Sequence, residues 1–548
     1  MIEQRNQYYS IVDDLLDKNN SLKDLHEKMT HRWNVPYFET ITPESVLDRM
    51  RNYVIGVYVS DEQVQLTAIA EMNPKKFDFV PGPKMYYGAL FYYPAAAFIA
   101  LGKITGLLSL TPGVEYYFTH PDEIRNMYML VRSMGGVSVV LAVLLIGFLA
   151  VRFYGEGFGL LSAAFLATFP LSVSLTHLAK SHILGMFWIV LSLGLVARIL
   201  KCERPGEGLL KEFSFLAVAL GCCAGVIFTN LILGAAIFFT EWAAQDWRLS
   251  PVFKSRRFWA SSALFFLVSA VLNFHFLLQW SEFQRYVQSM FIYFPAFHEL
   301  QLNEWPAYVK DVFTEHVSLP VLPFLVSGIF FAFKKKEKFM LVCVGVFLIL
   351  FAQNLVTTRH TPVNARLLPL IAVLSAWGVL GLWGALTRTF GRAILSLFVA
   401  GALGVAAVQC AYYWWLHRSP SRLDIAGEWI NQNVPKGESL GAWGGSFAPV
   451  EFPAIRFLDY KIISIPHSYE LDSTAIPIKK MPRFLVVAKG YSPGLAVRYP
   501  ESRYLAEHYR DVVVWKDADR TLERFFGTLW INAGNMSVVK VMEKKPGI

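Results

Sequence analysis

The sequence has few cysteines, few charges and no motif that binds a metal or a nucleotide. Its five cysteines lie in or beside apolar segments, without the CxxC or Cys/His spacing of a zinc site, so we expect neither a disulfide framework nor a metal site. No GxxxxGK[ST] motif follows a strand, which excludes a phosphate loop of that type. No repeat of fixed period occurs, so a transporter built from two matched halves gains no support.

The first 50 residues carry no long apolar run. They are polar and mixed in charge, and we interpret residues 1–60 as a polar N-terminal appendage. We expect neither a signal peptide nor an amino-terminal membrane anchor in this stretch.

The rest of the chain is apolar. Of 548 residues, 54% are hydrophobic, 15% are aromatic and only 17% are charged, which is well above the roughly 45–50% apolar content of soluble domains. The net charge is +9, but Lys and Arg gather in short clusters between apolar segments, as the positive-inside rule predicts. We therefore predict a polytopic α-helical membrane protein that does not bind nucleic acid.

Most of the apolar segments are long enough to cross a bilayer core of about 30 Å. They run over residues 86–110, 130–151, 158–176, 183–200, 214–245, 258–280, 317–333, 339–356, 367–387 and 393–416. The 214–245 run is too long for one span and is interrupted at Thr229 and Asn230, so we predict a tight helical hairpin there. These segments predict about ten transmembrane helices, with residues 130–416 as the transmembrane domain.

The basic clusters set the orientation in a plasma or inner membrane. We place them in the cytoplasm: Arg152; Lys201, Arg204 and Lys211; Arg248, Lys254, Arg256 and Arg257; Lys334, Lys335, Lys336 and Lys338; Arg388 and Arg392. The loops at 177–182, 281–316 and 357–366, and the tail from residue 417, then face the other side.

We predict that the tail, residues 417–548, is a small extracytoplasmic α/β domain. A helical stretch at 425–433 precedes a turn at 435–437, and strand-like runs follow at 484–487, 512–515 and 538–541.

The 86–110 segment leaves two topologies open. If it spans the membrane, Asp61 is cytoplasmic; if it lies in the interface, Asp61 joins the noncytoplasmic loops. Its crowded tyrosines and Lys103 favour the interface. Residues 61–129 then form a first external loop with interfacial helices.

Asp61 and Glu62 are paired carboxylates at the start of this region. Ionised groups beside lipid are costly and tend to mark substrate or ion pathways, so we take both as candidate catalytic residues. The simpler alternative is that Asp61 caps the helix that follows.

Several cations share the predicted noncytoplasmic side with these carboxylates. The candidates for a phosphate site are Lys84, Lys180, His182, Arg359, His360 and Arg366. A carboxylate that takes the proton of an attacking hydroxyl, with cations that neutralise a phosphate leaving group, is the chemistry of group transfer. Lys180 alone is also explained by a helix dipole or by snorkelling, and Arg359 and Arg366 by lipid headgroups. Transport pathways concentrate ionisable groups as well.

Five sequence segments, in this order along the chain, resemble those of one protein family. They are SDEQVQLTAIAEMNP, PKMYYGALFYYP, LVRSMGGVSVVLAVLLIGFLAVRFYGEGFGLLSAAFLATFP, ARLLPLIAVLSAWG and DIAGEWINQNVPKGESLG. Together they resemble the GT-C superfamily of integral membrane glycosyltransferases, in its branch of protein O-mannosyltransferases and aminoarabinose transferases. The resemblance covers most of residues 55–435.

The resemblance implies an inverting transfer outside the cytoplasm, from a sugar on a polyprenyl phosphate to a lipid, glycan or protein acceptor. Asp61 is the implied catalytic carboxylate, with Glu62 beside it. Where relatives carry a second acid, this chain has His182 in LAKSHILGMF, which indicates a different donor, weaker dependence on a divalent cation, or inactivity.

Relatives also enter the first external loop from a transmembrane helix, and residues 1–60 contain none. We expect either an incomplete amino terminus or a membrane partner subunit that supplies that helix. The alternatives to an active enzyme are a catalytically degenerate structural subunit, and a transporter or lipid-binding membrane scaffold.

Overall fold

The computed structural model describes most of the membrane segments and part of the tail. The described residues are 60–82, 87–111, 116, 120–201, 209–293, 305–356, 361–418, 422–443, 453, 455, 459–465, 482–489, 508–516 and 538–546. They fall into two compact units. Residues 64–102 and 129–415 form a helical unit, and the remaining described residues form a second unit around a β-sheet.

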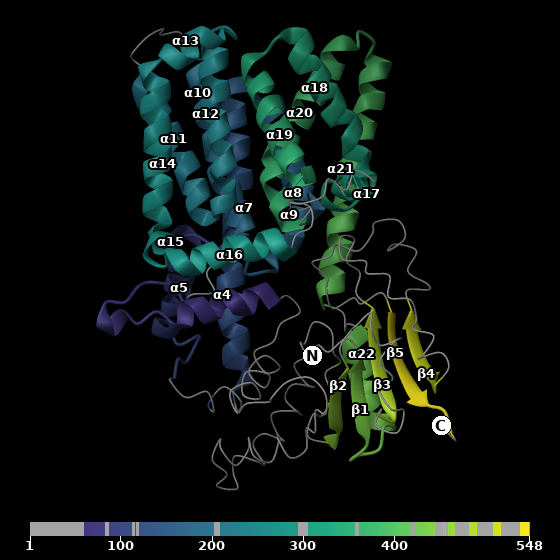
Figure 1. The fold of residues 1–548 in the computed structure, drawn as a ribbon. Coiled ribbons are helices and arrows are strands. Elements are labelled where there is room, and N and C mark those ends of the chain that lie inside the picture. The colour runs from purple at the N-terminus through teal and green to yellow at the C-terminus, as the bar shows by residue number, and fades with distance from the viewer. Residues whose placement is uncertain are drawn as a thin grey trace. The chain divides into compact units, whose positions relative to one another are not determined.

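Long apolar helices, side by side, dominate the helical unit (Figure 1). Its helices are α4 (Ser60–Ala70), α5 (Ala89–Ile104), α7 (Pro121–Tyr154), α8 (Glu156–Thr168), α9 (Pro170–Thr176), α10 (His182–Lys201), α11 (Leu210–Val226), η3 (Phe228–Gly234), α12 (Ala235–Ala244), α13 (Leu249–Lys254), α14 (Arg256–Leu272), α15 (Phe274–Leu278), α16 (Trp280–Tyr293), α17 (Trp305–Asp311), η6 (Val312–His316), η7 (Leu319–Val321), α18 (Leu322–Lys335), α19 (Lys338–Val356), η8 (Thr361–Leu367), α20 (Leu368–Ala385) and α21 (Thr389–Arg418). One end of each of α4, α5, α7 and α21 belongs to the second unit. A short helix, η1 (Pro74–Lys76), lies between α4 and α5.

The predicted polytopic helical class is confirmed. By length and composition, five helices in the described part of the chain are able to cross a membrane, or seven if each of two bent pairs counts as one span. The bent pairs are α8 with α9, which meet at 56°, and the α17–η6 helix with the η7–α18 helix, which meet at 96°. The described residues also include two shorter apolar helices, Ala89–Ile104 and Phe228–Ala244.

The predicted break at Thr229 and Asn230 is present. The chain leaves the α-helix after Val226, forms the tight helix η3, and returns in α12. The two ends of this hairpin meet at Arg257, whose guanidinium packs on Phe213 of α11 and pairs with Glu241 of α12. The pair is 2.7 Å long, and the Glu241 side chain is fully buried. Arg257 therefore links α14 to α11 and α12 at the ends of the helices where the three converge.

The aromatic segment after residue 86 forms α5, with Pro94 inside it. Its 16 residues extend about 24 Å, which is shorter than the bilayer core of about 30 Å; the interfacial placement of this segment stays a prediction. Gly88 fixes its start, because its N–H donates to Val226 O at 3.0 Å. A Cβ at Gly88 would lie 2.0 Å from Gly225 O, so only glycine permits this approach.

Two more glycines bring α18 and α20 into backbone contact. A Cβ at Gly328 would lie 1.8 Å from Leu374 O, and a Cβ at Gly378 would lie 2.0 Å from Phe324 O. Small residues at helix crossings in membranes permit this close approach, which maximises van der Waals contact. At these two glycines the helices therefore meet through backbone atoms, whereas further along, at Gly381, the Phe331 side chain lies between them.

The tail contains the predicted α/β fold. Helix α22 (Arg422–Asn433) is followed by β1 (Ser439–Trp443), β2 (Lys461–Ile465), β3 (Phe484–Lys489), β4 (Tyr509–Lys516) and β5 (Val538–Lys544). The strands form one sheet in the order β2-β1-β3-β5-β4. Strand β1 is parallel to β2 and β3, whereas β5 is antiparallel to β3 and β4.

The antiparallel part of this sheet contains a charge cluster around Glu543 of β5. Arg510 Nη2 lies 2.7 Å from Glu543 Oε2, and Arg483 Nη2 lies 3.1 Å from Glu543 Oε1. The hydrogen bond from Arg510, with that from Arg483, holds the pKa of the Glu543 carboxyl below its ordinary range. Arg483 also pairs with Glu438 at 2.6 Å.

We predict that Glu543→Gln destabilises the antiparallel strands by about 0.5–1 kcal/mol, the range of solvent-screened ion pairs. Hydrogen exchange of the β4 amides in the full chain measures this. Since the folded pKa is lowered, the contribution is complete above the unfolded pKa of about 4.3 and is lost as pH falls through the folded value. The difference between wild type and variant should shrink at acidic pH, and Glu438→Gln, which removes one contact, should have the smaller effect. An equal difference at every pH would contradict this assignment.

Candidate functional site

A buried arginine without an acidic partner marks the candidate site. Arg366 lies near the end of η8, just before α20, and its side chain is 4% exposed. Its Nη1 donates to Thr229 O at 3.2 Å, and its Nη2 donates to Asn354 Oδ1 of α19. No carboxylate in the described part of the chain pairs with it.

Neutral side chains surround this guanidinium. Asn354 Nδ2 donates to Asn364 Oδ1 at 2.7 Å, and the Tyr308 hydroxyl donates to the same oxygen at 2.5 Å. Asn364 Nδ2 lies 3.4 Å from His316 Nδ1. We call Tyr308, His316, Asn354, Asn364 and Arg366 the Arg366 cluster; all five are buried.

The charge of the Arg366 cluster is uncompensated. Removing a guanidinium from water costs several kcal/mol unless an opposite charge and hydrogen bonds replace the lost hydration. Here two hydrogen bonds to neutral oxygens replace part of it, and Arg366 Nε has no hydrogen-bond partner among the described residues. A buried positive charge with a free N–H suits an anionic group that arrives with a ligand, because arginine binds planar oxyanions through several N–H groups at once.

Two other predicted cations lie at the same end of the helices. Lys180 is in the connection between α9 and α10, is 1% exposed, and precedes His182 at the start of α10. Helices α9 and α10 both pack against η8, which carries Arg366. The His182 ring meets Tyr87 edge-on, with centroids 6.0 Å apart. The fold therefore gathers Lys180, His182 and Arg366 onto neighbouring elements.

The carboxylate pair lies at the start of α4. Glu62 is buried, whereas the side chain of Asp61 is outside the described residues. One turn further on, Gln65 Oε1 accepts a 2.5 Å hydrogen bond from the Tyr92 hydroxyl of α5, so the second half of α4 is fixed to α5. Lys84, Arg359 and His360 also lie outside the described residues, and their predicted roles stay predictions.

Sequence reasoning missed Glu315 and the four other members of the Arg366 cluster, Tyr308, His316, Asn354 and Asn364. Glu315 is 9% exposed and lies next to His316 in the π-helical turn η6. Its carboxylate makes no hydrogen bond or ion pair with any described residue. Gln409 of α21 supports this turn, donating to Thr314 O at 2.8 Å. Such turns inside helices are frequent at functional sites. The only sequence signal was the adjacency of Glu315 and His316 in a predicted external loop.

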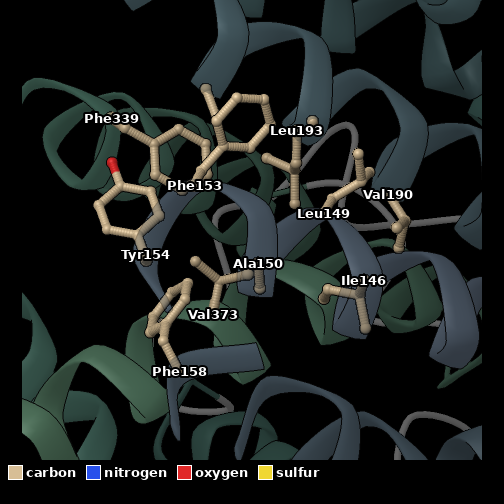
Figure 2. Close-up of a pocket in the computed structure, with 12 residues that line it drawn as sticks. Ile146, Leu149, Ala150, Phe153, Tyr154, Phe158, Val190, Leu193, Phe339 and Val373 are labelled. Atoms are coloured by element: carbon tan, nitrogen blue, oxygen red, sulfur yellow. The ribbon is translucent and has the colours of Figure 1, made fainter. Parts of the chain in front are cut away.

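A cavity elsewhere in the helical unit does not serve this site. It has a volume of about 20 Å³, room for about one water molecule, and Figure 2 shows its lining of aliphatic and aromatic side chains. Phe339 lines it at the start of α19, whereas Asn354 lies 15 residues later, about 22 Å along the helix. The cavity thus lies toward the basic loops, away from Arg366.

Solved structures resemble the chain, although no protein-family model and no curated protein match it. Apo oligosaccharyltransferase from Archaeoglobus fulgidus aligns with 80% of the chain at 13% identity, with a TM-score of 0.45. ArnT from Cupriavidus metallidurans, bound to undecaprenyl phosphate, aligns with 90% of the chain at 11% identity, with a TM-score of 0.44. The chain covers 65% of the oligosaccharyltransferase and 97% of ArnT. Both are GT-C membrane glycosyltransferases, the kind of protein that the sequence motifs resemble.

The contrast between Arg366 and Arg257 gives a stability prediction. Arg257→Met leaves the fully buried Glu241 uncompensated and should cost about 3–5 kcal/mol. Arg366→Met leaves two neutral oxygens short of a donor but removes an unpaired charge, so the net cost should stay below about 2 kcal/mol. Thermal unfolding of the detergent-solubilised proteins measures both. If Arg366→Met proves as damaging as Arg257→Met, Arg366 is a structural residue.

Proposed function

We propose that this protein is an integral membrane glycosyltransferase that moves a sugar from a polyprenyl-phosphate donor to a lipid, glycan or protein acceptor. The main support is the buried Arg366 guanidinium. Within the part of the chain that the structure describes, it has neutral partners only, and one of its N–H groups has none. A membrane-embedded site for a phosphate needs a cation that is not already neutralised by the protein.

The position of the cluster supports a noncytoplasmic reaction. Helix α10 carries His182 at its start and Arg198 and Lys201 in its last turn, and α19 begins at Lys338 and carries Asn354 near its end. The Arg366 cluster and the basic loops therefore lie at opposite ends of the same helices. Because basic loops favour the cytoplasm, the cluster belongs on the other side in the proposed topology.

In the proposed reaction, an acceptor hydroxyl attacks the anomeric carbon of the donor sugar. Asp61 takes the hydroxyl proton, the bond from acceptor oxygen to anomeric carbon forms, and the bond from that carbon to the phosphate oxygen breaks. Polyprenyl phosphate leaves with the bonding electrons, and the sugar inverts its configuration. Arg366 stabilises the charge on the departing phosphate, with Lys180 and His182 as the neighbouring cations; Glu62 supports Asp61.

Arg366→Met should weaken the binding of undecaprenyl phosphate at least about tenfold, because charge-assisted hydrogen bonds to an oxyanion contribute about 1.5–3 kcal/mol. Microscale thermophoresis of the solubilised full chain measures this affinity. The matched control is Lys338→Met, which removes a cation from the opposite end of the helices. Equal affinities in wild type and Arg366→Met would exclude this residue from the phosphate site.

Asp61→Asn should lower sugar transfer by about 10²–10⁴-fold, the usual contribution of a general base, while the affinity for undecaprenyl phosphate stays unchanged. Transfer from radiolabelled polyprenyl-phosphate sugars in purified membranes is the measurement. Glu71→Gln, which removes an exposed carboxylate just after α4, is the control. Full transfer activity in Asp61→Asn would remove this residue from the role of base.

The second candidate function is a non-catalytic subunit that binds a lipid phosphate. His182 favours it, because it stands where GT-C relatives carry a second acid. This candidate predicts normal binding of undecaprenyl phosphate by the wild type, with no transfer to any acceptor.

A further inference from the structure

A short exposed turn between α4 and α5 presents an aromatic ring beside two lysines. Asn73 and Asp78 close the turn with two backbone hydrogen bonds, from Asn73 N to Asp78 O at 2.8 Å and from Asp78 N to Asn73 O at 3.0 Å. Between them, Phe77 N donates to Pro74 O at 3.1 Å. We call residues 73–78 the Phe77 turn.

The turn holds Phe77 outward in an unfavourable conformation. Its backbone has φ 56° and ψ 23°, the left-handed region that bulky residues rarely adopt. Its side chain is 87% exposed. Exposing an aromatic ring to water is unfavourable, so this ring is suited to contact an apolar surface outside the protein.

The lysines beside the ring have no side-chain partners, whereas the nearby acids make local contacts. Lys75 and Lys76 are exposed and make no ion pair or hydrogen bond through their side chains with the described residues. Two acids nearby, Glu71 and Asp78, are exposed as well. Asp78 Oδ1 accepts from Val80 N at 3.2 Å, and the Glu71 carboxylate lies against Gly82, so each is held by a local contact and neither pairs with a lysine among the described residues. The turn therefore presents one ring and two ammonium groups that no described carboxylate neutralises by an ion pair.

The turn is attached to the helical unit rather than free of it. Tyr93 of α5 donates from its hydroxyl to Phe79 O at 3.1 Å, and Gly82 N donates to Ala68 O of α4 at 3.0 Å. Since Gly88 fixes the start of α5 against the Val226 end of α11, the turn keeps its place relative to the membrane helices. It stands beside the interfacial helix α5, where an aromatic ring meets lipid headgroups.

We propose that the Phe77 turn docks on anionic phospholipid headgroups, with Phe77 inserted at the acyl boundary and Lys75 and Lys76 on the phosphates. Ring insertion and lysine–phosphate attraction are the two terms that hold amphipathic elements to anionic membranes. The docked turn would hold α4, which begins with Ser60, Asp61 and Glu62, close to the membrane surface.

The experiment places the photocrosslinking amino acid p-benzoylphenylalanine at position 77 of the full chain. The protein is reconstituted into nanodiscs of phosphatidylcholine alone or of phosphatidylcholine mixed with phosphatidylglycerol, and crosslinked lipid is identified by mass spectrometry. We expect lipid adducts at position 77 that are at least about fivefold more abundant in the anionic discs, and that fall by a similar factor in Lys75→Gln/Lys76→Gln.

The control carries the same photocrosslinker at position 390, where Phe390 at the start of α21 is exposed. Its lipid adducts report correct insertion and should not depend on Lys75 or Lys76. Three outcomes would overturn the proposal: no lipid adduct at position 77, adducts to protein only, or equal adducts in neutral and anionic discs while position 390 crosslinks normally. Transfer activity plays no part in this readout, so it stands or falls separately from the proposed function.

Discussion

The guanidinium of Arg366 is buried by the packing of η8 against α9 and α10, and no acid among the described residues accompanies it. A buried cation of this kind depends on neutral oxygens to replace its lost hydration. The backbone carbonyl of Thr229 and the amide of Asn354 replace part of it. Asn364 holds the Asn354 amide, and Tyr308 and His316 in turn hold Asn364. The break in the 214–245 segment is part of the same requirement, because it exposes the Thr229 carbonyl that a continuous helix would occupy.

The helical unit contains both paired and unpaired buried charged residues. At the end near the basic loops, Arg257 is neutralised by Glu241, and the pair joins three helices. At the other end, Arg366 and Glu315 are both buried and neither has an ion-pair partner among the described residues. A protein under selection for stability alone gains by neutralising such groups or by replacing them with apolar ones. Among these groups, Arg257 with Glu241 therefore fits a structural role, whereas Arg366 and Glu315 fit a ligand site.

Much of the architecture was predictable because it follows from local patterns. The hydrophobic segments, the interruption at Thr229 and Asn230, the turn at Gly437 and three of the five described strands of the tail all depend on residues close together in sequence. Strands β1 and β2 were not predicted. The Arg366 cluster does not, since Tyr308 and Asn364 are separated by 56 residues and neutral amides carry no recognisable spacing. Glu315 was equally hidden, because its burial results from a π-helical turn that packs against other elements. Asp61 belongs to the second unit. The side of the membrane that it faces stays a prediction.

The backbone contact at Gly328 and Gly378 has a mechanical consequence. Helices α18 and α20 touch through main-chain atoms over more than a turn, so one cannot tilt or slide against the other without losing close contact along the whole crossing. Secondary transporters work by rocking one bundle against another, and this pair is poorly suited to such a hinge. The two helices behave instead as a fixed frame, and movement in this part of the helical unit is left to the segments that join them.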